Sequence, residues 1–279
     1  MTADVRPIDL LVLPFTPDLR RAFERDPAQK ETLVRVFPVW DNTFTGEELL
    51  TDMDAAGVDR VIMPAFATND TYLAEATYEV VRGLMQLAPD RIHGVVGIDP
   101  RRIMESVAKI RCAVEEHGFI GVHSYPHWFG LLPDDRSYYP IYATCVELGV
   151  PIQIQVGQAW QTTLRGVGKP EAIDSVAVDF PDLRVICDHI GFPWEREMIS
   201  VAMKQPNVYI GADTHHPRTW APELIEYING SGQEKVIWGT NKPVLEFGPM
   251  LEAMRALPIE RAAFAKLTRH NIERVYRFD

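Results

Sequence analysis

Histidines and one carboxylate follow several of the apolar runs in this chain. His123 and His189 each end such a run, and Asp213 and His215 come just after a third. An imidazole has an unperturbed pKa of about 6.5, so it can give or take a proton at neutral pH. We therefore predict that His189 acts as a general acid or base and that Asp213 supports it. A buried structural histidine and a turn-forming aspartate are the plainer alternatives.

Uncharged amides and a lysine follow two further apolar runs. Gln155 lies near the end of one run, and Asn241 and Lys242 come directly after another. Amides can hydrogen-bond to a substrate without adding charge, and a lysine can meet a carboxylate. Aromatic residues such as Trp160 in the connecting segments indicate an apolar pocket, although loop packing would explain them too. The residues predicted to bind substrate are His123, Gln155, Trp160, His215, Asn241 and Lys242.

Eight short apolar runs are the elements that must position these side chains. They are rich in Val and Ile and are continuous rather than alternating, which is typical of parallel strands covered on both faces. Helical segments separate them along the chain. The runs cover residues 8–15, 58–64, 91–100, 119–123, 150–157, 183–189, 207–211 and 235–239.

Eight strands alternating with helices predict a closed (β/α)8 TIM barrel, a fold that typically needs about 250 residues. We expect a single domain over residues 1–279, with a long insertion at 16–45 after the first strand and further helices after residue 250. A doubly wound open sheet is the competing fold, but no GxGxxG follows the first strand. Because chemistry in such barrels lies at the carboxyl ends of the strands, the polar residues above should converge there.

Composition and charge exclude several classes of function. The 279 residues carry 28 Lys and Arg against 39 Asp and Glu, a net charge of -11, so nucleic acid and anionic membranes are not expected partners. The first apolar run is too short to cross a membrane and lacks the features of a signal peptide, which favours a cytoplasmic protein. Three widely spaced cysteines predict neither disulfides nor a zinc-thiolate site. A small-molecule substrate is the expected partner.

The chain resembles the amidohydrolase superfamily, in the branch that contains aminocarboxymuconate-semialdehyde decarboxylase and related aromatic-acid decarboxylases. The resemblance implies an enzyme with the barrel fold, a homodimer and a divalent metal, usually zinc. It rests on five pieces in the expected order: the I-D frame ending in Pro at 8–14, the strand at 151–155, R-x-x-x-x-H-x-G at 184–191, the W-G-T-N-K-P segment at 238–243 and N-x-x-R-x-Y at 271–276.

The metal-binding positions that the resemblance implies hold other residues in this chain. Two histidines of the first strand, one of the fifth strand and an aspartate of the eighth correspond to Leu11, Leu13, Gln155 and Asn241. Zinc needs three or four nitrogen, sulfur or carboxylate ligands, which these residues do not supply. We therefore predict that the family metal site is absent and that no cofactor is used. A rearranged zinc or manganese site built from His123, His127, His215 and His216 is left open.

Three functions follow from these observations. The first is a metal-independent enzyme that acts on a small cyclic or aromatic carboxylate or lactone, by decarboxylation, lactone hydrolysis or related proton transfer, with His189 as general acid or base. The second is a non-catalytic ligand-binding or scaffold protein. The third is a metal-dependent hydrolase or decarboxylase with a rearranged site. The polar strand ends favour the first, since a purely structural barrel would tolerate apolar residues there.

Overall fold

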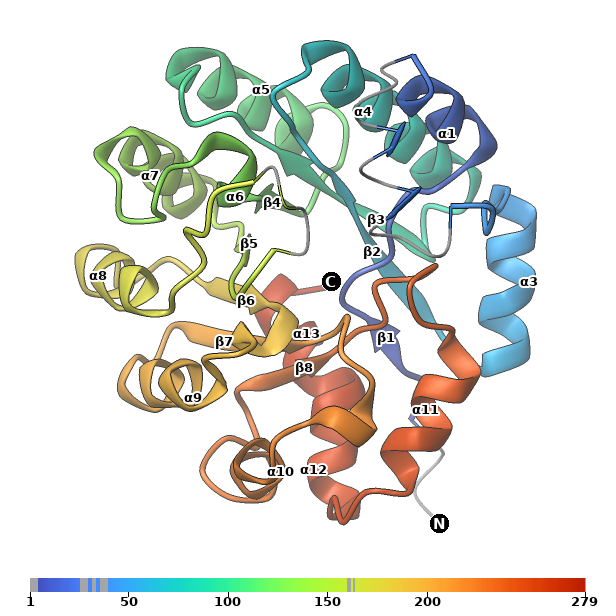
Figure 1. Ribbon diagram of the computed structural model, residues 1–279, viewed down its shortest axis with the longest axis vertical. Coiled ribbons are helices and arrows are strands. Elements are labelled where there is room, and N and C mark those ends of the chain that lie inside the picture. Colours follow the sequence, from blue (N-terminus) through green and yellow to red (C-terminus); the bar gives the residue numbers. More distant parts are fainter. Residues whose placement is uncertain are drawn as a thin grey trace.

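The computed structural model describes residues 5–25, 30–31, 34–35, 40–159, 162 and 164–278. Eight parallel strands pair in the order β1 to β8, and helices surround the ring that they form (Figure 1). The predicted (β/α)8 barrel is confirmed. Within the described residues, no helix combines the length and the apolar character that a membrane span requires.

The strands are shorter than the apolar runs that predict them. The first is cut to two residues because the Asp9 carboxylate accepts a hydrogen bond from Leu11 N (2.9 Å) and the chain bends there. The strands are β1 (Ile8–Asp9), β2 (Arg60–Ala65), β3 (Ile92–Gly97), β4 (Gly121–Ser124), β5 (Ile152–Gln155), β6 (Val185–Asp188), β7 (Val208–Ala212) and β8 (Val236–Trp238).

Local sequence signals fix several helix ends. Thr45 and Glu48 form a reciprocal capping box at the start of α3, and Gly57 ends that helix in the left-handed conformation. The described helices are α1 (Pro17–Phe23), α3 (Gly46–Ala56), α4 (Thr71–Leu87), α5 (Ile103–Glu115), α6 (Pro126–Phe129), α7 (Tyr139–Leu148), α8 (Glu171–Asp179), α9 (Glu195–Lys204), α10 (Pro222–Asn229), α11 (Phe247–Arg255), α12 (Arg261–Ala265) and α13 (Asn271–Tyr276).

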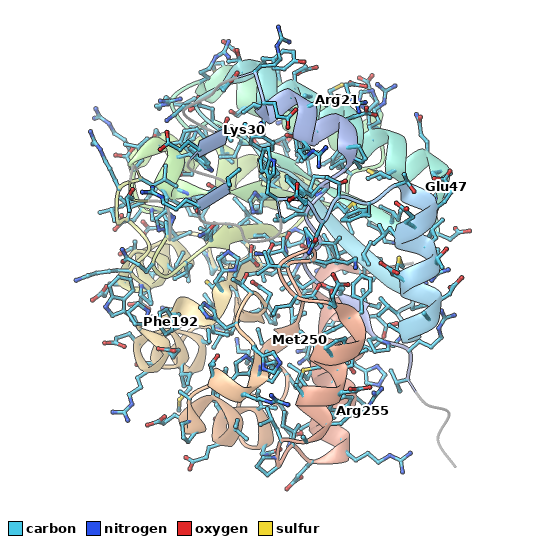
Figure 2. All side chains as sticks on the ribbon, turned by 45° about the vertical axis from the view of Figure 1, so that its right-hand side comes forward. Arg21, Lys30, Glu47, Phe192, Met250 and Arg255 are labelled. Carbon is cyan, nitrogen blue, oxygen red and sulfur yellow. The ribbon has the colours of Figure 1, made fainter. Side chains whose placement is uncertain are left out.

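Apolar side chains form two layers, one between strands and helices and one inside the barrel. Inside, Ile8 and Leu10 meet Ile186 and Ile237, and α13 adds Tyr276 from the amino end. Charged side chains such as Glu47 and Arg255 point to solvent on the outer helices (Figure 2). The inner layer fills the amino half of the barrel, so only the carboxyl half is left for polar groups.

Hydrogen bonds between the first and last strands close the ring. Leu10 N donates to Trp238 O (3.1 Å), and Asn241 N donates to Leu11 O (2.8 Å). The buried Asp9 carboxylate also accepts from both the backbone N–H (3.0 Å) and the hydroxyl (2.6 Å) of Thr240. The hydrogen bonds lower the pKa of Asp9, but burial has the larger effect and raises it to about 7.

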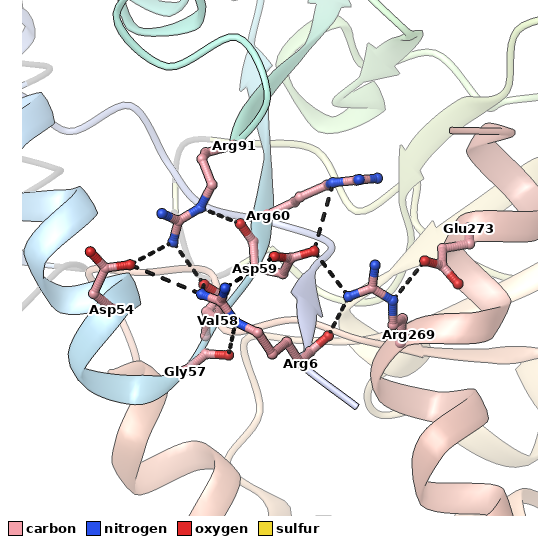
Figure 3. A network of polar contacts seen from close by, with 9 residues as sticks. All are labelled: Arg6, Asp54, Gly57, Val58, Asp59, Arg60, Arg91, Arg269 and Glu273. Atoms are coloured by element: carbon pink, nitrogen blue, oxygen red, sulfur yellow. Dashed lines mark hydrogen bonds and ion pairs between the residues drawn. The ribbon is translucent and has the colours of Figure 1, made fainter. Parts of the chain in front are cut away.

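Paired charges hold the amino end of the barrel (Figure 3). Arg269, just before α13, donates to Arg6 O (2.9 Å), to Asp59 Oδ2 (2.9 Å) and to Glu273 Oε1 (2.6 Å). Arg91 reaches Asp54 on α3 from the start of β3 (3.0 Å). These contacts join the two ends of the chain to the entrance of β2, so this network stabilises the fold.

Candidate active site

A histidine–aspartate pair lies at the carboxyl ends of β6 and β7. The backbone N–H of His189 donates to both oxygens of Asp213 (3.2 and 3.3 Å), and the ring Nδ1 hydrogen-bonds to Asp213 Oδ1. Asp213 is fully buried, whereas 14% of the His189 side chain is exposed. Because Nδ1 is engaged by the carboxylate, a further partner of the ring would have to bind at Nε2.

A glycine makes room for this aspartate. A Cβ added to Gly211 would lie 2.6 Å from Asp213 Oδ2, which is closer than non-bonded atoms approach. The carboxylate can therefore turn back over β7 and reach the neighbouring strand β6. Adjacent strand ends thus bring together the two residues that the sequence predicted to be catalytic.

Thr214 and Asn241 extend the pair into a hydrogen-bonded chain. The Thr214 hydroxyl lies 2.6 Å from His189 Nδ1 and donates to Asp213 Oδ1 (3.0 Å), while Asn241 Nδ2 donates to that hydroxyl (2.8 Å). His189, Thr214 and Asn241 all have left-handed backbones, with φ of 69°, 61° and 57°. Side chains rarely adopt this conformation, and such strain gathers at functional sites.

His123 and Asp188 lie deeper, at the ends of β4 and β6. His123 Nε2 is 4.0 Å from Asp188 Oδ2, and both side chains are almost fully buried. Burial, followed by the charge of His189, lowers the pKa of His123 to about 3, so its imidazole is neutral at physiological pH. Gln155, also buried, is in register with Asp188 on the adjacent strand. The structure therefore places His123 and Gln155 at the same end of the barrel as His189.

His215 and His127 occupy the rim of this end. The His215 ring lies 4.9 Å from that of Phe192, and burial lowers its pKa to about 4. His127 hydrogen-bonds through Nε2 to Gly157 O (3.0 Å), and burial lowers its pKa to about 4 as well. Both rings are thus neutral at physiological pH and can shape the entrance without adding charge.

Lys242 does not join this group. Its ammonium contacts Asp52 on α3 (2.9 Å) and Glu246 before α11, and it lies over the Phe247 ring. The charge is therefore already balanced on the outer side of the barrel. Trp160, the aromatic residue predicted to bind substrate, lies outside the described residues.

The rearranged zinc or manganese site that the sequence leaves open has no counterpart in the described part of the chain. There, the one group of three possible ligands with donor atoms within 4.8 Å of one another is Cys112, Glu116 and His117. It lies at the end of α5, on the outside of the barrel, away from His189.

Asp188 and Gln153 are polar residues of this end of the barrel that sequence reasoning did not select. Gln153 could have been found, because the I-Q-I-Q alternation of β5 turns it to the same face as Gln155. Asp188 is distinguished in the sequence only by preceding His189. The lack of a hydrogen bond to either of its oxygens within the described chain becomes visible only in three dimensions.

Comparison with known proteins identifies the family. Residues 14–278 match the amidohydrolase family model, so this chain belongs to that family. Structural neighbours with this fold include decarboxylases and a hydratase.

Three relatives illustrate the similarity. A 2-keto-4-carboxy-3-hexenedioate hydratase from a Sphingobium species is 30% identical over 159 residues, which span 48% of this chain and 47% of the relative. An uncharacterised TIM-barrel protein from Bordetella bronchiseptica superposes with a TM-score of 0.81 at 25% identity, covering 98% of both chains. A 5-carboxyvanillate decarboxylase from Novosphingobium aromaticivorans has a TM-score of 0.74 at 16% identity, covering 100% of both chains.

The prediction that the protein uses no cofactor is contradicted by these structures. The carboxyvanillate decarboxylase holds manganese, as do further decarboxylase structures with this fold, which points to a metal cofactor. The residues at the four family ligand positions do not fit such an ion, because Leu11 and Leu13 have no donor atoms and Gln155 and Asn241 are neutral amides. Other residues would have to hold a metal. The cytoplasmic location and the homodimer stay predictions.

Proposed function

We propose that this protein is a lyase of the decarboxylase or hydratase type, acting on a small aromatic or unsaturated carboxylate at the carboxyl end of the barrel. The observation that carries the proposal is the His189–Asp213 pair, held at the ends of neighbouring strands with Nε2 left for a substrate. The family membership and the activities named for the relatives support the substrate class.

Both reactions need a proton to be delivered to a carbon atom. When carbon dioxide leaves, the electron pair of the broken bond must be taken up by a proton, and when water adds to a double bond, one carbon receives the proton. His189 Nε2 would supply it. The buried Asp213 carboxylate balances the charge of the protonated ring and holds its orientation, and general acid–base catalysis of this kind contributes typically about 10²–10⁴-fold.

The remaining polar groups would position the substrate. Asn241 and Thr214 fix the pair through the chain of hydrogen bonds described above. His123, neutral at physiological pH, can donate or accept a single hydrogen bond without attracting a counter-ion. Lys242 is not needed in this arrangement, since its charge is paired elsewhere.

A pair of variants tests the proposal. Wild type, H189N and the surface control H270N are assayed against hydroxybenzoates and unsaturated dicarboxylates, by carbon dioxide release and by ultraviolet absorbance. Each assay is run with added Mn²⁺ and again after chelation, so that the effect of His189 is measured in either state. We expect turnover of at least one compound by wild type and H270N, and a loss of about a hundredfold or more in H189N.

The result that contradicts the proposal is equally direct. If H189N keeps its fold by circular dichroism and turns over the same compound at the wild-type rate, His189 is not the proton donor. If wild type turns over no compound in either metal state but binds some of them, the non-catalytic ligand-binding alternative replaces the proposal.

A further inference from the structure

Asp188 is a buried carboxyl group that has no hydrogen-bond partner for either oxygen among the described residues. Unpaired buried carboxyl groups are costly and rare in folded proteins, so each one calls for an explanation. Asp188 ends β6 directly before His189 and faces the barrel interior, in line with Ile186. The His189–Asp213 pair described above does not use it.

Among the described residues, no lysine or arginine forms an ion pair with Asp188. His123 approaches from β4 at 4.0 Å, Gln153 lies beside it on β5, Asp213 faces it from β7, and Tyr276 comes from α13. Burial and then Asp213 raise the pKa of Asp188 well above its usual range, while the Gln153 amide lowers it. Burial beside a second carboxylate therefore favours the protonated form of this carboxyl group, and that form can donate one hydrogen bond.

Two neighbours of this carboxyl group also have unused hydrogen-bonding atoms. One of the two N–H groups of the Gln153 amide donates to Leu10 O (3.0 Å), which sets the orientation of the amide. Its Oε1 and His123 Nδ1 are unpartnered within the described chain. We call Asp188, His123 and Gln153 the polar floor. The atoms of the polar floor suit a single substrate oxygen. As a carbonyl, this oxygen can accept a hydrogen bond from Asp188, and as a hydroxyl it can donate one to an acceptor of the floor. A charged carboxylate would meet the acceptor atom of Gln153.

We propose that Asp188 is a second proton-transfer residue, which contacts a substrate oxygen that alternates between the carbonyl and the enol or phenol form. The inference rests on the proposed function and adds to it. In the step we assign, Asp188 gives its proton to the carbonyl oxygen while His189 Nε2 takes the proton of the adjacent carbon. The C–H electron pair forms the carbon–carbon double bond, and the carbonyl π pair forms the new O–H bond.

The reverse step returns both protons, so no oxidant, reductant or further reactant is required. The substrate class follows from this assignment. It is a carboxylate whose reacting carbon lies next to a carbonyl, enol or phenol oxygen, with that oxygen on the polar floor and the carboxylate turned toward the rim. A substrate bound in the opposite orientation would place its carboxylate on the polar floor and its carbonyl or hydroxyl oxygen at the rim.

Binding of stable enol mimics tests the assignment without knowledge of the natural substrate. Isothermal titration calorimetry is used to compare 2-, 3- and 4-hydroxybenzoate with benzoate and with the three methoxybenzoates, on wild type, D188A, D188N and the surface control D182N. We expect one hydroxybenzoate to bind wild type and D182N at least tenfold more tightly than benzoate or its methoxy counterpart. D188A should lose that preference, and D188N should keep part of it, because an amide still pairs with a hydroxyl.

Three results would overturn the proposal. One is that no hydroxybenzoate binds wild type better than benzoate, and another is that the preference survives in D188A. The third is that Mn²⁺ alone binds wild type and not D188N, which would make the floor a cation site. H189N separates this inference from the proposed function, since it should keep the hydroxyl preference while losing turnover.

The kinetic readout distinguishes proton transfer from simple packing. On a compound that wild type turns over, D188N should lower kcat about tenfold or more with little change in KM, because the amide fills the same space but cannot exchange a proton. An equal kcat in D188N and wild type would show that Asp188 only binds. Unfolding curves of each variant check that the fold is kept.

Discussion

At the amino end of the barrel, Arg269 contacts Asp59, Glu273 and a backbone carbonyl, so that a partly buried charge is paired with two carboxylates. At the carboxyl end, Asp188 and His123 are more deeply buried and carry atoms without a hydrogen-bond partner in the described chain. Each unsatisfied buried polar group costs about 1–3 kcal/mol. The charges of the Arg269 network are thus paired within the described chain, whereas Asp188 and His123 keep hydrogen-bonding capacity that the proposed substrate would use.

The two ends also differ in backbone geometry. Left-handed residues with side chains gather at the carboxyl end, in His189, Ile190, Thr214 and Asn241. The paired network at the amino end holds one such residue nearby, Arg277, at the close of α13. The ion pairs at the amino end thus stabilise the fold and offset the backbone strain at the carboxyl end.

The largest expected effect lies at the strained end. D213N should lower kcat/KM by about a hundredfold or more, because an amide in place of the carboxylate cannot balance a protonated His189. Steady-state kinetics on a compound turned over by wild type measure it, with D182N as the surface control. If folded D213N kept half of the wild-type activity, the carboxyl end would be no more important for catalysis than the amino end, and the prediction would be wrong.

The next effect should fall on stability alone. R269A is expected to lower the free energy of unfolding by about 1–3 kcal/mol, because Asp59 and Glu273 lose a partner in a partly buried network. Urea unfolding measures the loss, and activity should stay within about twofold of wild type. A large loss of activity with unchanged stability would show that the amino end takes part in function.

Acid sensitivity gives a third test, at His123. Its folded pKa of about 3 lies below the unfolded value of about 6.5, so the unfolded state binds the proton first as pH falls. Stability from this group is complete above pH 6.5 and is lost below it, by about 1.4 kcal/mol per pH unit. H123N should therefore show a shallower fall of unfolding free energy between pH 6.5 and 5 than wild type. Equal slopes would mean that His123 is charged in the folded state.

The smallest effect is expected away from both ends. Arg102 and Glu105 form an exposed pair at the start of α5, and R102A should change stability by less than about 0.5 kcal/mol. Thermal unfolding beside R269A measures it. A loss as large as that of R269A would show that burial does not govern the strength of these pairs.

The barrel was predictable because eight continuous apolar runs leave few other arrangements, and the strand order then placed His189 and Asp213 at adjacent strand ends. The length of β1 was not predictable, since the bend at Asp9 comes from a hydrogen bond between the Asp9 carboxylate and the backbone N–H of Leu11. The position of Lys242 was not either. A residue just past a strand can turn inward or outward, and the partner that decides it, Asp52, lies far away in the sequence.

The contact between Asp9 and Thr240 has a consequence for how the protein is made. The residues that it joins are 231 positions apart, so during synthesis the first strand must wait until Thr240 has left the ribosome. Until then Ile8 and Leu10 have neither β8 nor α13 to cover them. The nascent chain therefore carries an open sheet edge for most of its translation, the state in which a chaperone would meet it.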